Sequence, residues 1–303
     1  MSVGAAVALV LYAGFQPIFV LAPLAVLLLA SGPSTRREWW WIALSLVWLA
    51  YTSISMGGLV DQTVLAGGVL VGGAFFAMMI RRPRPAFEVA LWALLLGGAA
   101  LLFWGAWLGI GWRDIKLAVF REGWALVRGV ENPDPTVIAP DSSAAMKVYT
   151  DALTRGIGPM ATLFPALMAL SAVGGLVLAW NWYHRISLRP LGAPLARLAE
   201  FTFSDQLVWG VILGLAALVL PLPQAVQEAG GNLVLFFGGL FVVRGLAVVR
   251  TWIRQTPGPL LGLMAFSLLF IWPVAAGGLL SLGLADAWLD FRRRLAAPPT
   301  VEG

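Results

Sequence analysis

Arg244 lies inside an apolar run that extends from residue 232 to 250, and its charge needs an explanation. An arginine at the centre of a membrane-spanning helix costs about 2.5 to 3.5 kcal/mol on insertion scales. A functional Arg244 would face neighbouring helices and bind a carboxylate or another anionic group. The alternative is that its long side chain extends toward the membrane surface near Arg250, about 9 Å along the helix axis.

Asn181 and Arg185 form a second group, at the end of the apolar run from 157 to 183. Residues four apart share one face of a helix, so this pair could line a cytoplasmic mouth. The simpler interpretation is an interfacial helix end with positive charge, and His184 is then an interfacial histidine.

A third polar group follows the run at 206–223 and consists of Gln224, Gln227, Glu228 and Asn232. Together with the polar segment near mid-chain it could form a vestibule for a ligand. A solvated turn is the alternative. Upstream of the run, either Ser204 or Asp205 can cap the helix that begins there.

The motifs that the chain lacks predict that it is not an enzyme. It has no phosphate-binding G-x-x-x-x-G-K-[ST] loop, no cysteine and a single histidine, and no pair of acids lies inside a predicted span. We therefore expect no catalytic residues, no cofactor and no metal, and we expect that the chain cannot energise transport with an ATPase of its own.

Composition places these residues in a membrane. Hydrophobic residues make up 60% of the 303 positions and charged residues only 12%, far from the balance of soluble proteins. The net charge of +5 does not indicate nucleic acid, because the basic residues lie in short loops between apolar runs.

The apolar runs predict an all-α, polytopic transmembrane bundle of about eight spans in one integral membrane domain, residues 1–303. We read the first run as an uncleaved, kinked span and not as a signal peptide; a half-helix to Ala13 followed by a span from Phe15 is the alternative. The predicted spans are 4–31, 39–58, 62–80, 87–110, 157–183, 206–223, 232–250 and 259–283.

Short-loop charge predicts the orientation of the bundle. Ten arginines fall on one side, which we interpret as cytoplasmic, and the loops at 58–61 and 224–231 carry no Lys or Arg. The tail at 292–294 disagrees, because eight crossings place it on the other side. Either one span is miscounted, which we favour, or the tail lies outside the cytoplasm. The ten are Arg36, Arg37, Arg81, Arg82, Arg84, Arg185, Arg189, Arg197, Arg250 and Arg254.

The polar insertion at 111–156 is predicted to be extracytoplasmic. Residues 112–130 have an apolar and a charged face, which is typical of an amphipathic helix in the headgroup layer or against the bundle. A Pro-rich stretch follows, and a second helix is expected from Asp141 or Ser142 to about Thr154. Gly156, Gly158 and Pro159 are expected to end it.

Small residues four apart recur in the predicted spans and let helix backbones approach closely. Ordinary packing within the chain is the first interpretation, and a docking face for a partner is the second. The spacings are Gly68/Gly72, Gly105/Gly109, Ser171/Gly175/Ala179 and Gly210/Gly214.

The sequence from Gly283 to Arg292, GLADAWLDFR, resembles the ending of the YybS-like bacterial membrane proteins, a family of unknown function. Residues 181–185, the loop that follows them and the aromatic segment 201–209 are similar to that family as well. The family is distantly similar to substrate-binding subunits of energy-coupling-factor transporters and to the cell-shape protein MreD. The resemblance implies a multi-pass protein of the bacterial cytoplasmic membrane.

Two functions remain as hypotheses. The first is a solute-binding or transport-type membrane subunit that binds a small molecule and needs a separate energising partner. The second is a non-catalytic membrane scaffold for cell-envelope or division proteins. Besides the lipid bilayer, the expected partners are therefore a small-molecule ligand and an energising or scaffold protein. The expected contact residues are Arg244, Asn181, Arg185, Gln224, Gln227, Glu228 and Asn232.

Overall fold

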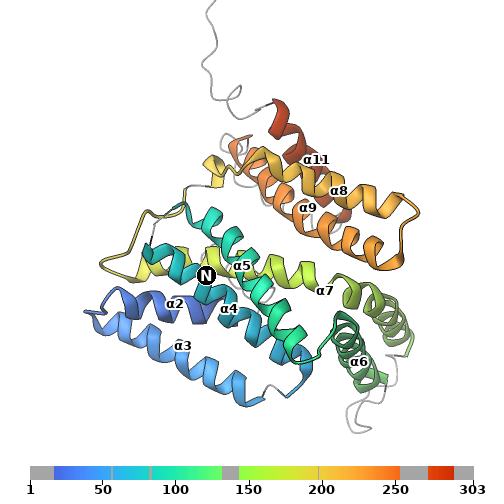
Figure 1. The fold of residues 1–303 in the computed structure, drawn as a ribbon, viewed down its shortest axis with the longest axis horizontal. Coiled ribbons are helices and arrows are strands. Elements are labelled where there is room, and N and C mark those ends of the chain that lie inside the picture. Colours follow the sequence, from blue (N-terminus) through green and yellow to red (C-terminus); the bar gives the residue numbers. More distant parts are fainter. Residues whose placement is uncertain are drawn as a thin grey trace, which may run out of the picture. The chain divides into compact units, whose positions relative to one another are not determined.

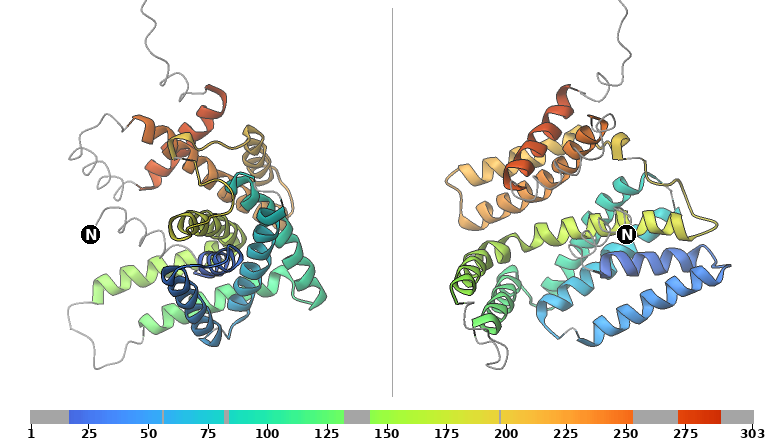
Figure 2. Two further views of the ribbon diagram at one scale, coloured as in Figure 1. Left: turned by 90° about the vertical axis from the view of Figure 1, so that its left-hand side faces the viewer. Right: turned by 180° about the vertical axis from the view of Figure 1, so that it is seen from behind.

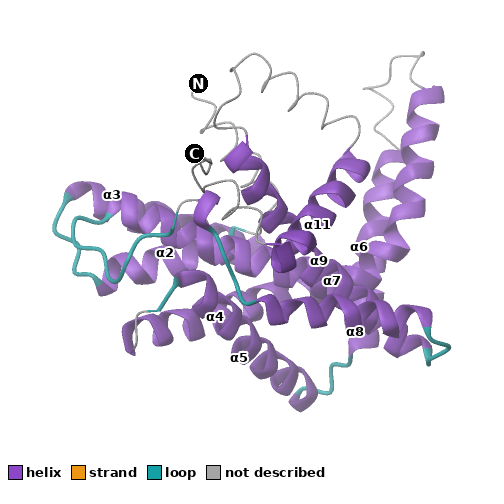
Figure 3. Ribbon diagram, turned by 90° about the horizontal axis from the view of Figure 1, so that it is seen from above, coloured by secondary structure: helices purple, strands orange, loops and turns teal. Residues whose placement is uncertain are grey.

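The computed structural model describes residues 17–55, 57–81, 84–131, 143–196, 198–252 and 272–289. Within these ranges every regular element is a helix, and Figure 3 shows helices and loops but no strand. The predicted all-α class is therefore confirmed. The chain divides into two compact units, Met1–Leu195 and Ala196–Gly303, and each is described by itself.

The first unit is built around α2 (Ile18–Ala30), which packs against α3 (Arg36–Ser55), α4 (Leu59–Arg81) and α7 (Ser143–Ile186). Figures 1 and 2 show α2 and α3 side by side. Apolar residues occupy all sides of α2, as expected of a helix that is enclosed by others. Its fully buried side chains include Phe19, Val20, Leu24, Leu27 and Leu28.

Small residues set the close packing of this unit. A Cβ atom on Gly68 would lie 2.8 Å from the side chain of Ile18, and one on Gly97 would lie 2.6 Å from the backbone of Val71. These glycines therefore serve packing within the chain, and Gly68 agrees with the first interpretation of the Gly68/Gly72 spacing.

Gly109 serves a different purpose and corrects the Gly105/Gly109 spacing. It follows α5 (Ala86–Trp107) with φ +71°, a conformation that side chains other than glycine rarely adopt. The backbone N–H of Ile110 donates to the carbonyl of Gly105 at 2.9 Å, so the last carbonyls of α5 are satisfied by a Gly-terminated turn.

The predicted helix break near residue 156 is wrong. α7 continues from Ser143 to Ile186 and contains Pro159 and Pro165 in its interior. Proline removes one hydrogen bond from a helix, but neighbouring helices can compensate for that loss. α6 (Trp112–Glu131) packs beside α7, which confirms a helix at 112–130, while the Pro-rich stretch at 132–140 lies outside the described residues.

The second unit contains α8 (Val208–Val219), α9 (Gln224–Trp252) and α11 (Trp272–Leu289), with short 3-10 turns η1 (Leu198–Glu200) and η2 (Asp205–Leu207) before α8. Glycines bring its helices together, since a Cβ on Gly283 of α11 would overlap the backbone of Phe241 in α9. Gly210 of α8 likewise lies against Phe237 of α9, so it is not exposed to a partner.

Four helices in the described part of the chain are long and apolar enough to cross a membrane: Leu59–Arg81, Ala86–Trp107, Arg155–Ile186 and Gln224–Arg250. They match the spans predicted at 62–80, 87–110, 157–183 and 232–250. Three shorter apolar helices fall within or beside the spans predicted at 4–31, 206–223 and 259–283. Residues 4–16 of the first of these spans and 259–271 of the last lie outside the described ranges. The prediction at 39–58 falls on α3, which is less apolar.

Candidate functional site

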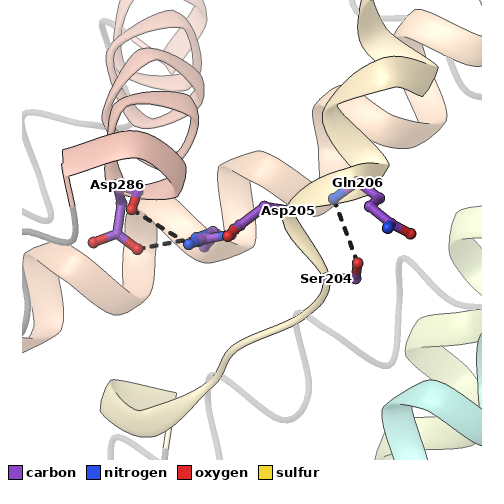
Figure 4. A network of polar contacts seen from close by, with 5 residues as sticks. Ser204, Asp205, Gln206 and Asp286 are labelled. Carbon is purple, nitrogen blue, oxygen red and sulfur yellow. Dashed lines mark hydrogen bonds and ion pairs between the residues drawn. The ribbon is translucent and has the colours of Figure 1, made fainter.

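Three charged side chains meet in the second unit, one each from η2, α9 and α11. Arg244 of α9 is 5% exposed, and its guanidinium donates from Nε to Oδ2 of Asp286 at 2.9 Å and from Nη1 to Oδ1 of Asp205 at 2.5 Å. Nη2 also donates to the backbone carbonyl of Asp286 at 3.3 Å. Figure 4 shows Asp205 and Asp286 approaching from different elements.

The local structure of η2 places Asp205 at this cluster. Ser204 caps the turn, because its side-chain oxygen accepts a hydrogen bond from the backbone N–H of Gln206 at 3.4 Å. Of the two predicted capping residues, the structure therefore uses Ser204. That choice leaves the carboxylate of Asp205 available to Arg244, where 62% of the Asp205 side chain remains exposed.

Aromatic residues form the apolar wall of the cluster. The ring of Phe203 lies 5.4 Å from the guanidinium carbon of Arg244, in the range of a cation–π contact. Phe203 also packs edge-on against Phe241, with ring centroids 5.2 Å apart. Apolar residues from all three helices continue this wall, so the ionic cluster sits at the edge of the hydrophobic core of the unit.

The energetic cost of this cluster depends on how deeply its charges are buried. The side chain of Asp286 is fully buried, and that of Arg244 is 6% exposed. Two isolated charges in such surroundings would be costly, but as a hydrogen-bonded pair they compensate each other. Arg244 therefore faces protein and binds two carboxylates of its own chain, and its contact with a ligand or partner stays a prediction. The Arg244 side chain does not extend toward the membrane surface near Arg250, because it is buried and bonded to Asp286 and Asp205.

The second predicted group lies at the end of α7. Asn181 is half-buried and Arg185 is exposed, and the cytoplasmic mouth that they could line stays a prediction. His184 instead contacts the loop that follows the helix. Its Nδ1 lies 3.1 Å from the carbonyl oxygen of Trp180, and its Nε2 lies 3.4 Å from that of Gly192.

The third predicted group forms the first turns of α9 and is not a separate turn. Gln224 donates to the Glu228 carboxylate at 3.1 Å, and Asn232 donates to the Glu228 carbonyl at 2.9 Å. Gln227 donates to the carbonyl of Leu220 at 3.4 Å, just before the helix begins. These contacts stabilise the start of α9, and the vestibule stays a prediction.

Glu38 is a buried acid that no pattern in the sequence singles out. Its Oε2 accepts from the backbone N–H groups of Ser34 and Thr35 at 2.9 Å, and its Oε1 accepts from the N–H of Leu188 at 3.0 Å. The Leu188 hydrogen bond is the largest cause that lowers the pKa of Glu38 from 4.5 to about 2, against the opposing effect of burial. Glu38 therefore holds the loop after α7 to the start of α3.

A depression of about 390 Å³, lined by apolar and charged side chains, lies between α6 and the start of α4. Burial and, second, the neighbouring carboxylate of Asp61 raise the pKa of Glu122 in its wall. This depression is open to the surface. Its lining residues are Leu59, Asp114, Leu117, Ala118, Arg121 and Glu122.

Sequence reasoning found Arg244 but missed its partners. In the sequence, Asp286 draws attention only as part of the GLADAWLDFR segment, because the last predicted span, 259–283, ends before this acid. α11 in fact continues to Leu289, so an acid does lie inside an apolar helix. The signal was present in the sequence, since Asp286 is the only charged residue between 272 and 289.

Metal binding receives no support in the part of the chain that the structure describes, where no group of three His, Asp or Glu side chains is arranged to hold an ion. In comparisons with family models, with curated proteins and with solved structures, no match to the chain is found. Helix length and composition define the class, a helical, multi-pass membrane protein.

Proposed function

We propose that this protein is a solute-binding, transport-type subunit of the bacterial cytoplasmic membrane, that it belongs with the YybS-like proteins, and that a separate partner energises it. The observation that carries the proposal is the buried ion pair between Arg244 and Asp286. Ionisable residues inside apolar helices are rare and are found where ligands or ions are bound or moved.

Energetics support a functional origin for the pair. A buried ion pair is often no more stabilising than apolar residues of the same volume would be. The second unit has apolar surroundings that would accept such residues, including Leu280 and Leu284 beside Phe241. A charged pair that stability alone does not require is therefore consistent with a role in binding.

The scaffold function is less well supported. Its docking faces were expected at Gly68/Gly72 and Gly210/Gly214. A Cβ on each of these glycines would lie within 3.3 Å of another helix of the same unit, so these faces are already occupied. No contact in the described residues favours this second function over the first.

Native mass spectrometry of the purified protein tests the proposal. Wild-type protein is compared with the double variant Arg244→Gln/Asp286→Asn, which removes both charges together and leaves no single buried charge. Glu88→Gln is the control, because Glu88 forms an exposed ion pair with Arg84. We expect a small molecule bound to wild type and to the control but lost from the double variant. A wild-type spectrum with no small molecule and a stoichiometric protein partner would favour the scaffold.

A further inference from the structure

The partners of Arg244 are unequal. Asp286 receives two of the three hydrogen bonds, one at its carboxylate and one at its backbone carbonyl, and its side chain is fully buried. Asp205 receives the third with a side chain that is 62% exposed. Water competes for an exposed carboxylate, so the Asp205 contact is the weaker of the two ion pairs.

We propose that the Nη1 edge of Arg244 is a binding site for a small oxyanion, a carboxylate or a phosphate group, which takes the place of the Asp205 carboxylate. This inference rests on the proposed solute-binding function and names the chemical class of the ligand.

Charge balance permits the exchange. Arg244 and Asp286 together are neutral, and the charge of Asp205 is carried by an exposed group. Replacing one exposed oxyanion on Nη1 by another leaves the buried pair unchanged, so the exchange does not add an uncompensated charge to the interior.

The guanidinium is also held in place before a ligand arrives. Asp286 fixes its Nε and Nη2 positions, and the ring of Phe203 covers one face at 5.4 Å from the guanidinium carbon. A planar, oriented guanidinium suits carboxylates and phosphates because its N–H groups match their oxygen atoms. Asp205 is then an internal competitor for this edge.

Titration with inorganic phosphate tests the competition. Wild type, Asp205→Asn and the control Glu200→Gln are purified in a maltoside detergent, and melting temperature is followed by tryptophan fluorescence at constant ionic strength with chloride as the balancing anion. Glu200 is an exposed acid of η1 and does not contact Arg244 in any hydrogen bond of the cluster. We expect phosphate to bind Asp205→Asn roughly two- to fivefold more tightly than wild type, the ratio that corresponds to a weak surface ion pair. The control should behave as wild type.

The double variant Arg244→Gln/Asp286→Asn completes the test and should show no response to phosphate. Its melting transition in the absence of phosphate verifies that it is folded. If Asp205→Asn, wild type and the double variant respond equally, or if Asp205→Asn does not respond, the inference is wrong.

Lipid headgroups and free solutes share this chemistry, and a second arm separates them. Asp205→Asn in phosphatidylcholine nanodiscs is compared with the same variant in nanodiscs that contain phosphatidylglycerol. If Asp205→Asn retains phosphatidylglycerol and the double variant does not, the oxyanion is a lipid headgroup. If Asp205→Asn responds to phosphate but does not retain phosphatidylglycerol, the oxyanion belongs to a free solute. If a small molecule binds equally to wild type and to the double variant, the ion pair is not needed for binding. That result would refute both the oxyanion site and the role of the ion pair in the proposed function. If the small molecule binds wild type but not the double variant, and Asp205→Asn does not respond to phosphate, only this inference is wrong.

Discussion

Glu38 shows how a single side chain can serve two segments of the first unit. Its carboxylate accepts backbone N–H groups from the start of its own helix and from Leu188 after α7. At 2% exposure it has little access to water. Hydrogen bonds to a charged acceptor are stronger than those between neutral groups, so the negative form of Glu38 stabilises this junction.

The acidity of Glu38 gives a prediction about pH. The pKa is lowered in the folded protein, so the stabilising effect is fully present above 4.5 and is lost as the pH falls toward about 2. We expect Glu38→Gln to be less stable than wild type at pH 7 by about 1 to 3 kcal/mol, and to lose less stability between pH 5 and pH 3. Melting temperatures in detergent measure both effects.

Glu88→Gln is the matched control for this measurement, since it removes an exposed carboxylate from an ion pair on α5. It should follow the wild-type dependence on pH. Parallel curves for wild type and Glu38→Gln across the acidic range would show that the charge of Glu38 does not stabilise the junction.

Packing between α9 and α11 depends on glycine at the element scale. The two helices approach so closely at Gly245 and Gly283 that a Cβ atom on either would overlap the backbone of the other helix. Two other glycines of α11, Gly277 and Gly278, have open space where a Cβ would lie. One helix therefore contains both a glycine that packing requires and glycines that it does not.

This difference predicts unequal effects of alanine. Gly283→Ala should lower the free energy of unfolding by about 2 to 3 kcal/mol or more, because a backbone carbonyl cannot move aside as a flexible side chain can. Gly278→Ala should change it by less than about 1 kcal/mol and in the stabilising direction, since alanine favours helix. Unfolding of both variants in detergent, monitored by fluorescence, gives the comparison.

Equal losses in the two variants would mean that alanine disturbs α11 for a reason other than the approach of α9. Gly97 and Gly98 of α5 offer the same comparison in the first unit, where only Gly97 lies against Val71.

For the molecule as a whole, apolar run length predicted much of the helical content. The helices α4 and α5 and the apolar part of α7 begin and end near the predicted limits, because span length is set by the thickness of the hydrocarbon layer. Helix α9 ends near its predicted limit but begins at Gln224, well before the predicted start at residue 232. Glycine and proline are local signals for a helix end, and they do not report the packing that lets α7 continue through Pro159, so the predicted break is wrong.

The candidate site was predictable only in part. A charge in an apolar run is visible in the sequence, and Arg244 was found in this way. Its partners are 39 and 42 positions distant along the chain, and nothing in local composition connects them. Likewise Glu38 receives its decisive hydrogen bond 150 positions away.

The orientation of the chain in the membrane is a prediction at this same scale. The chain has no cysteine, so a single introduced cysteine can be labelled without background. Leu222 and Arg189 are both exposed loop residues and are predicted to lie on opposite sides. In intact cells, a membrane-impermeant maleimide should label Leu222→Cys and should label Arg189→Cys only after permeabilisation. The reverse pattern would invert the predicted orientation.

The bond between Glu38 and Leu188 also has a consequence for biogenesis. A ribosome delivers α2 and α3 long before it translates Leu188, and until then one oxygen of the Glu38 carboxylate lacks its backbone donor. The amino-terminal helices therefore reach the lipid with this junction incomplete, and the arrival of the segment after α7 completes it. Assembly of the first unit is in this respect finished by its last residues and not by its first.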